Sequence, residues 1–399
     1  MKRVSMFNQL LKLINKQEFS KSVIELKSDR YAKSFSSWDH MVSMMFCQLA
    51  QAKSLREISG GLQCCEGKLQ HLGMNGAPKK STLSHANKHR PWQLYQRVFN
   101  NLLQQCQAIA PKKKFRFKNP LKSLDATTID LCLSMFDWAK FRTTKGAIKL
   151  HLLLDHDGYL PSYAHITEGK VHEVNIAHEL KFPKGTIIAM DKGYTDYDLY
   201  QKWTDSEVWF VTRLKDNAAY EVVETKTLPQ RTNIRKDEII RLTGYTSQKK
   251  CSSLLRRVEV WDEEGQRTII LLTNHMKFAA STIASIYKDR WEIEQFFKAL
   301  KQNLKIKTFV GTSSNAVHIQ VWTALIAMLM LKYLQFKSKA SWSLSTLVAL
   351  LRWNLFTYRD LWEWIDKPYE TPPDQPEYSQ ILLGLDSINP LHLKTQAMI

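Results

Sequence analysis

The sequence predicts an α/β domain with a β-rich insertion, preceded by an all-α N-terminal domain and followed by C-terminal helices. Apolar residues recur at helical spacing up to about residue 110, and short apolar, β-branched runs follow from Leu124. Helical spacing then returns at about Ser281. With 399 residues, 44% of them hydrophobic, the chain can bury a substantial core in two or three domains.

The predicted N-terminal domain, residues 1–110, contains several short helices, and the segment from Trp38 shows the clearest helical spacing. A turn-rich passage then leads to a short helix that Ser81 is predicted to cap. This helix is expected to carry four basic side chains on its outer surface: His85, Lys88, His89 and Arg90. The order resembles a DNA-binding helix-turn-helix, but a basic, solvated helix of an ordinary bundle fits equally well.

Five strands are predicted in the α/β domain, residues 120–340. Their sequences are LDATTIDLCLSMF, AIKLHLLLD, LPSYAHITEG, GTIIAMDKGY and VWFVTRLK. DHDG joins the second strand to the third as a hairpin, and helical segments lie on either side of the fourth. Further strand-like runs without intervening helices predict the β-rich insertion at about 216–274. Residues 341–399 are expected to form C-terminal helices, which permit dimerisation, and a Pro-punctuated tail.

The charge of the chain favours a polyanionic partner. Lys and Arg number 57 against 38 Asp and Glu, giving a net charge of +19 and a pI near 9.5. Nucleic acid is therefore the first candidate and a membrane surface the second. The longest apolar run, Ala324–Leu331, is far shorter than the roughly 20 residues of a membrane span. Six scattered cysteines lack metal-binding spacing, which indicates reduced structural thiols.

One helix carries an unusual set of polar residues. In YKDRWEIEQFFKALK, Tyr287, Arg290, Glu294 and Lys301 project onto one arc of roughly 60° at about 100° per residue. Intrahelical ion pairs would explain Arg290 with Glu294, but not Lys301, since Lys298 is the better-placed partner for Glu294. A functional interpretation uses all four side chains: the carboxylate binds a divalent metal and the three donors bind phosphates.

Metal-assisted phosphodiester chemistry needs further carboxylates, and the predicted sheet supplies them. Asp125 lies in the first strand and Asp191 directly follows the apolar run of the fourth, where α/β sheets usually place ligand sites. Five competing aspartates are assigned to other positions. Asp130 is expected on the opposite strand face, Asp137 at the turn before the second strand, Asp155 in the hairpin, and Asp196 and Asp198 at a helix start.

The pattern Y-x2-R-x3-E-x6-K resembles the signature of bacterial transposases of the insertion-sequence-four family. LDATTIDL and AMDKGYTD are similar to that family's first and second acidic motifs. The resemblance implies a ribonuclease-H-like fold and a DDE triad of Asp125, Asp191 and Glu294, which binds two Mg²⁺ ions, with Mn²⁺ as a substitute. The implied DNA-contacting residues are Tyr287, Arg290, Lys301, Lys298 and Arg213.

The implied activity is cleavage at terminal inverted repeats and strand transfer into target DNA by a homodimer in a synaptic complex. Some relatives use a tryptophan to hold a flipped base, and here Trp261 and Trp291 are both candidates. The N-terminal segment lacks a secretory signal, so we expect a protein of the bacterial cytosol, associated with the nucleoid rather than a membrane. Two alternatives stay open: a non-catalytic sequence-specific DNA-binding protein, and a nuclease of the same fold without strand transfer.

Overall fold

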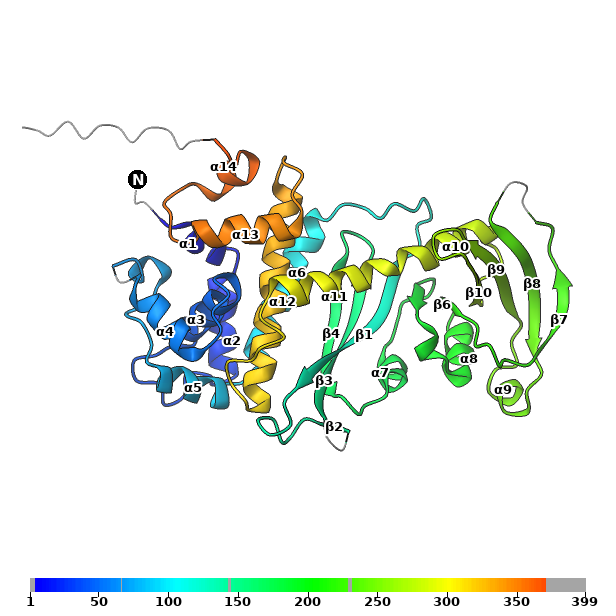
Figure 1. The fold of residues 1–399 in the computed structure, drawn as a ribbon, viewed down its shortest axis with the longest axis horizontal. Helices are drawn as coiled ribbons and strands as arrows, with labels where there is room; N and C mark the ends of the chain where they lie inside the picture. Colours follow the sequence, from blue (N-terminus) through cyan, green and yellow to red (C-terminus); the bar gives the residue numbers. More distant parts are fainter. Residues whose placement is uncertain (1–3, 66, 143–144, 229–231, 371–399) are drawn as a thin grey trace, which may run out of the picture.

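The computed structural model describes residues 4–65, 67–142, 145–228 and 232–370. The molecule is elongated, with a helical body at one end and a sheet that extends to the other (Figure 1). The C-terminal tail predicted from about residue 370 lies almost entirely outside the described residues.

The helical body combines segments from both ends of the chain. Its helices are α1 (Met6–Leu11), α2 (Lys16–Glu25), α3 (Ser37–Leu49), α4 (Leu55–Gln63), α5 (Lys80–His89), α6 (Gln93–Ile109), α12 (Ser314–Lys337), α13 (Leu344–Asn354) and α14 (Leu361–Asp366). Backbone hydrogen bonds from Met6 to Thr357 and from Phe7 to Leu355 join the N-terminal helix to the C-terminal segment. Residues predicted as separate N-terminal and C-terminal regions therefore share one hydrophobic core.

Helix α12 is the central element of this core. Its 24 residues are long and apolar enough to cross a membrane, although the apolar run identified in the sequence covers only part of it. In the structure 83% of its most apolar 18-residue window is buried. Packing against the surrounding protein therefore accounts for its apolar composition.

Within the described residues the sheet contains ten strands: β1 (Leu121–Leu131), β2 (Lys140–Arg142), β3 (Lys145–Asp155), β4 (Leu160–Glu168), β5 (Ile187–Met190), β6 (Trp209–Arg213), β7 (Tyr220–Thr225), β8 (Ile234–Leu242), β9 (Leu255–Asp262) and β10 (Arg267–Thr273). β1, β3 and β4 pair antiparallel in succession, whereas β5 pairs parallel to β1 and β6 parallel to β5. Three antiparallel strands extended by two parallel ones form the predicted ribonuclease-H-like sheet.

The β-rich insertion continues this sheet instead of forming a second one. β10 pairs antiparallel with β6, and β9, β8 and β7 follow in order. Buried Arg256 on β9 binds Asp237 on β8 through two hydrogen bonds of 2.7 Å. The same guanidinium donates to the carbonyl of Phe278, so the insertion is fixed to the segment that begins the next helix.

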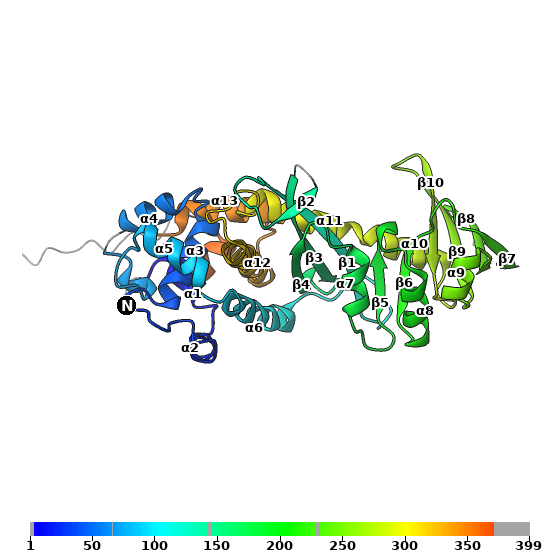
Figure 2. The same cartoon turned by 90° about the horizontal axis from the view of Figure 1, so that it is seen from below.

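Helices cover both faces of the sheet. On one side lie α7 (Glu173–Glu179), α8 (Tyr197–Asp205) and the short α9 (Tyr245–Lys250). On the other side α10 (Ala280–Asp289) and α11 (Trp291–Asn303) run from the insertion across the sheet to the helical body (Figures 1 and 2). Arg290 separates them but keeps helical dihedral angles, with φ −54° and ψ −29°. Together α10 and α11 form a nearly continuous helical rod, called the rod below. The single helix predicted over 287–301 lies within it and contains its one irregular residue, Arg290.

The structure corrects the prediction for the basic helix α5. Its N-cap is Lys79, so Ser81 lies inside the helix and does not cap it. His85, Lys88 and His89 are exposed as expected, but Arg90 is buried. The Arg90 guanidinium donates 2.6 Å to the carbonyl of Ser36, because the chain after α5 turns back into the core. Arg90 therefore stabilises the fold and is not part of an exposed basic surface.

The hairpin between β3 and β4 packs closely against the helical body. Gly158 has a φ of +72°, and a Cβ there would meet Ala110 and Phe336 at 2.9 Å. We expect Gly158→Ala to reduce the free energy of unfolding by about 1–3 kcal/mol, since it adds both backbone strain and overpacking.

Urea denaturation would measure this effect. Gly60→Ala is the matched control, because nothing lies within 4 Å of the added Cβ at this position in α4. Equal unfolding free energies for the two variants would contradict the close packing of the hairpin.

Candidate active site

Two of the predicted acids are brought together by parallel strand pairing. β1 and β5 pair in register from Leu121 with Ile187 to Leu124 with Met190. Asp125 and Asp191 are the next residues along these two strands, and neighbouring strands lie about 4.8 Å apart. Asp191 leaves the strand as the cap of a short 3-10 helix. Both acids therefore lie at the carboxyl end of β5, where the sheet opens to a loop.

Arg290 connects the third predicted acid to the first. Its guanidinium donates a 2.7 Å hydrogen bond to Glu294, one turn along the helix, and lies 3.6 Å from a carboxylate oxygen of Asp125. At this junction the Ile293 amide donates to the Arg290 carbonyl, which makes a tighter i to i−3 turn. The rod is thus attached to β1 by one buried arginine between two acids.

Tyr287 and Arg213 lie beside this group. The Arg290 guanidinium is 5.4 Å from the centre of the Tyr287 ring. Burial raises the pKa of Tyr287, and so does Asp191, whereas Arg290 and Arg213 act in the opposite direction. Burial also opposes the charge of Arg290, but the surrounding Tyr287, Glu294 and Asp125 raise its pKa overall. Tyr287, Arg290 and Glu294 therefore share one surface, as the helical wheel predicted.

Asp125 is largely buried and lies near two further acids. Burial raises the pKa of its carboxyl to about 7, although the Ala126 amide and Arg290 oppose the shift. Glu294 and Glu173 raise it further. Glu173 begins α7 and pairs with Lys149 at 3.3 Å. Glu173 was not predicted as a site residue, because its segment was interpreted only as a connecting helix. Its position in the first turn of a helix that follows a strand could have indicated that it lies near the site.

The composition of the site fits a divalent cation. Carboxylate oxygens are the ligands that Mg²⁺ and Mn²⁺ prefer, and Asp125 lies near two further acids, Glu294 and Glu173, that raise its pKa beyond the effect of burial. Among the described residues, however, no three His, Cys, Asp or Glu side chains lie close enough to hold a metal. Glu294 instead bonds Arg290, which lies between it and Asp125. The metal-binding role of the triad stays a prediction.

The remaining predicted DNA contacts are more distant along the rod. Lys301 donates 3.0 Å to the carbonyl of Thr128 on β1, and burial lowers its pKa. It therefore fixes the far end of α11 to the same strand that carries Asp125. Lys298 is exposed, and the described structure contains no ion pair between it and Glu294. Arg213 ends β6 and is partly exposed.

The competing aspartates have structural partners. Asp155 accepts 2.8 Å from Lys122 and 3.1 Å from the Asp157 amide in the hairpin. Asp196 caps α8 by accepting from the Leu199 amide at 2.8 Å. These observations confirm the hairpin and cap interpretations.

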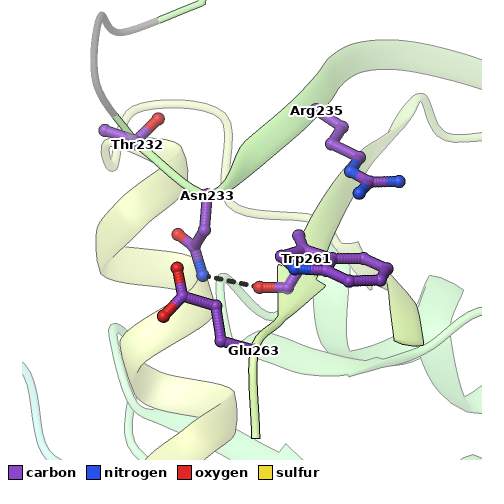
Figure 3. Close-up of a pocket in the computed structure, with 5 residues that line it drawn as sticks. All are labelled: Thr232, Asn233, Arg235, Trp261 and Glu263. Atoms are coloured by element: carbon purple, nitrogen blue, oxygen red, sulfur yellow. Dashed lines mark hydrogen bonds between the residues drawn. The ribbon is translucent and has the colours of Figure 1, made fainter. Parts of the chain in front are cut away.

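The two candidate tryptophans differ in their surroundings. Trp291 begins α11 and is 54% exposed. Trp261 lines a pocket of about 360 Å³ in the insertion, together with Thr232, Asn233, Arg235 and Glu263 (Figure 3). The Arg235 guanidinium lies 4.1 Å from the centre of the Trp261 ring.

Family models match two parts of the chain. Residues 116–330, more than half of it, match the family described as Transposase DDE domain. Residues 2–75 match a family described as Domain of unknown function (DUF4372).

The chain is also similar to named relatives. The chain is 30% identical over 306 residues to y4zB of Sinorhizobium fredii, which is named as a transposase, covering 76% of this chain and 83% of y4zB. It is 28% identical to a protein of Geobacillus stearothermophilus named as a transposase for insertion sequence element IS5377. This match covers 66% of this chain and 70% of that protein. It is 24% identical to transposase InsG of element IS4 from Escherichia coli. This match covers 48% of this chain and 44% of InsG.

A solved structure also aligns with the chain. The cryo-EM structure of the piggyBac transposase synaptic complex with hairpin DNA aligns with a TM-score of 0.43 and 10% identity, over 93% of this chain and 83% of that chain.

The raised pKa of Asp125 predicts a pH-dependent stability. Between the ordinary carboxyl pKa of 3.8 and about 7, the folded protein holds a proton that the unfolded chain has released. Stability from this group is therefore present at low pH and is lost as pH rises towards 7. Asp125→Asn removes the titrating group, so the variant should gain about 1 kcal/mol or more relative to wild type at pH 8, without divalent ions, and less at pH 5.

Urea denaturation of both proteins at the two pH values measures the difference. Asp155→Asn is the control, because Asp155 is salt-bridged in the hairpin. If the stability difference between Asp125→Asn and wild type is the same at both pH values, the raised pKa of Asp125 is contradicted.

Proposed function

The chain belongs to the family of DDE transposases, and from this premise we propose that Asp125, Asp191 and Glu294 are its metal-binding catalytic triad. The protein is an insertion-sequence transposase and its reaction is transposition. The observation that carries the proposal is the β1–β5 register, which sets Asp125 beside Asp191 under the rod that bears Glu294.

The proposed reaction is phosphodiester cleavage at the terminal inverted repeats, followed by strand transfer into target DNA. Two bound Mg²⁺ ions, or Mn²⁺ ions in their place, would supply activation of the attacking hydroxyl and stabilisation of the leaving oxygen. The protein's part is to present the carboxylates from a rigid sheet edge and a rigid helix. Arg290 bonds Glu294 and lies 3.6 Å from Asp125, so it would keep the Glu294 carboxylate close to this acid.

The basic and phenolic groups around the triad are proposed to contact DNA phosphates. Tyr287, Arg290 and Arg213 lie nearest the acids, while Lys298 and Lys301 extend the same helix face. Contacts of this kind hold the DNA backbone in position without reading its sequence. The net charge of +19 supplies long-range attraction for the duplex.

The assembly and domain roles follow from the same proposal. We propose a homodimer that joins two transposon ends in a synaptic complex, in the bacterial cytosol near the nucleoid. The region 1–110 would contribute to DNA binding, 120–340 would carry catalysis, and 341–399 would contribute to dimerisation. Exposed aromatic residues support the last role: Trp353 on α13, Trp362 on α14, and Tyr358 in the segment between these helices.

Replacing Glu294 provides the direct test of the triad. Glu294→Gln should reduce Mg²⁺-dependent nicking of a duplex carrying the element's terminal repeat by about 1000-fold or more, since it removes a metal ligand. DNA affinity and far-UV circular dichroism should stay close to wild type. Glu292→Gln, two residues earlier on the same helix, is the matched control and should nick normally.

Joining of the cut end to a target plasmid separates transposition from simple nuclease activity. Site-specific nicking without joining would favour the nuclease alternative. Binding without nicking in wild type would favour the DNA-binding alternative, and nicking retained in Glu294→Gln would contradict the proposed triad.

A further inference from the structure

A buried hydrogen-bond chain lies directly beside the proposed triad. Ser123 Oγ is 2.7 Å from His156 Nε2, and His156 Nδ1 is 2.6 Å from an Asp289 carboxylate oxygen. Ser123 belongs to β1, His156 to the β3–β4 hairpin and Asp289 to the last turn of α10. The chain therefore joins three segments that are distant in sequence.

The two ends of this chain are adjacent to two proposed site residues. Ser123 precedes Asp125 by two positions, so both lie on the same face of β1. Asp289 directly precedes Arg290, which contacts Asp125. The rod is thus attached to one strand face by two parallel connections, one through Asp289 and one through Arg290.

Hydrogen bonds from His156 and Lys114 stabilise the charged form of the Asp289 carboxylate. Burial by itself would raise the pKa of Asp289, but hydrogen bonds from His156 and Lys114 bring it below the ordinary value. The carboxylate accepts from His156 Nδ1, which turns Nε2 towards the Ser123 hydroxyl. Tyr159 also donates to Asp289, at 3.3 Å.

The arrangement has the order of a serine hydrolase triad, but its environment excludes that chemistry. Ser123 is 0% exposed and His156 1% exposed, and the Asp289 side chain is 1% exposed. A substrate cannot reach the Ser123 hydroxyl in such a position. The three side chains can act only through the elements that they connect.

We propose that Ser123, His156 and Asp289 are positioning residues. They fix the position of Arg290 relative to Asp125, and through Arg290 they fix the position of Glu294. The inference rests on the proposed function, because the position of Arg290 affects the reaction only if the triad performs it. Small displacements of a reacting group can cost orders of magnitude in rate, so loosening the junction should reduce catalysis more than DNA binding.

His156→Gln tests this with a matched control, His40→Gln. His40 is also fully buried and has two partners, Asn87 and Tyr95 at 2.8 and 2.9 Å, but it lies in α3 of the helical body. Both variants should lose thermal stability. At saturating terminal-repeat DNA and a temperature where each stays folded, only His156→Gln should lose nicking rate, by about tenfold, with DNA affinity unchanged in both.

Hydrogen–deuterium exchange of residues 286–294 provides a readout that does not require activity. Exchange should accelerate in His156→Gln and not in His40→Gln. If the wild-type protein does not nick DNA, that result contradicts the proposed function but not the positioning role. The hydrogen–deuterium exchange rates would still test the positioning role. Unchanged exchange at the junction, or equal nicking rates in the two variants, would overturn the inference.

Should His156→Gln fail to fold, Ser123→Ala removes one hydroxyl from the same chain and leaves almost no cavity. Its control is Ser43→Ala, whose equally buried hydroxyl donates 2.7 Å to the Asp39 carbonyl in the helical body. A slower nicking rate and faster junction exchange in Ser123→Ala alone would support the positioning role. Equal behaviour of the two alanine variants would overturn it.

Discussion

The parallel pairing of β1 with β5 is the constraint on which the rest of the site depends. Its register sets Asp125 beside Asp191, and the antiparallel pairing of β1 with β3 holds the first strand in place. Burial raises the pKa of the Asp125 carboxyl, and Glu294 and Glu173 raise it further. Arg290 opposes this shift and lies 3.6 Å from Asp125, so it connects the rod to β1 at the site.

The rod is also fixed to the rest of the molecule at several points along its length. Its first end is fixed to the insertion through Arg256, its junction to β1 through Asp289 and Arg290, and its far end to β1 through Lys301. Such a rigid element can carry a catalytic carboxylate with little freedom to move. The insertion, which extends the same sheet, therefore contributes to the placement of Glu294 although it supplies no acid of the proposed triad.

Sequence periodicity predicted much of this arrangement, because strands and helices with one buried face leave a regular pattern. The five strands, the helical connections and the shared face of Tyr287, Arg290 and Glu294 were all predictable. Long-range contacts were not. Arg90 entered the core, and Glu173 reached the site, through chain reversals that carry no periodic signal. The buried chain from Ser123 to Asp289 likewise depends on tertiary packing alone.

Crystals of the protein with its terminal-repeat duplex, soaked in Mn²⁺, would test the central claim most directly by anomalous diffraction. The account predicts anomalous peaks between Asp125 and Asp191, with the Glu294 carboxylate turned from Arg290 towards the bound ion. Peaks located elsewhere, or an Arg290 that still bonds Glu294 while Mn²⁺ occupies a site without these acids, would contradict it.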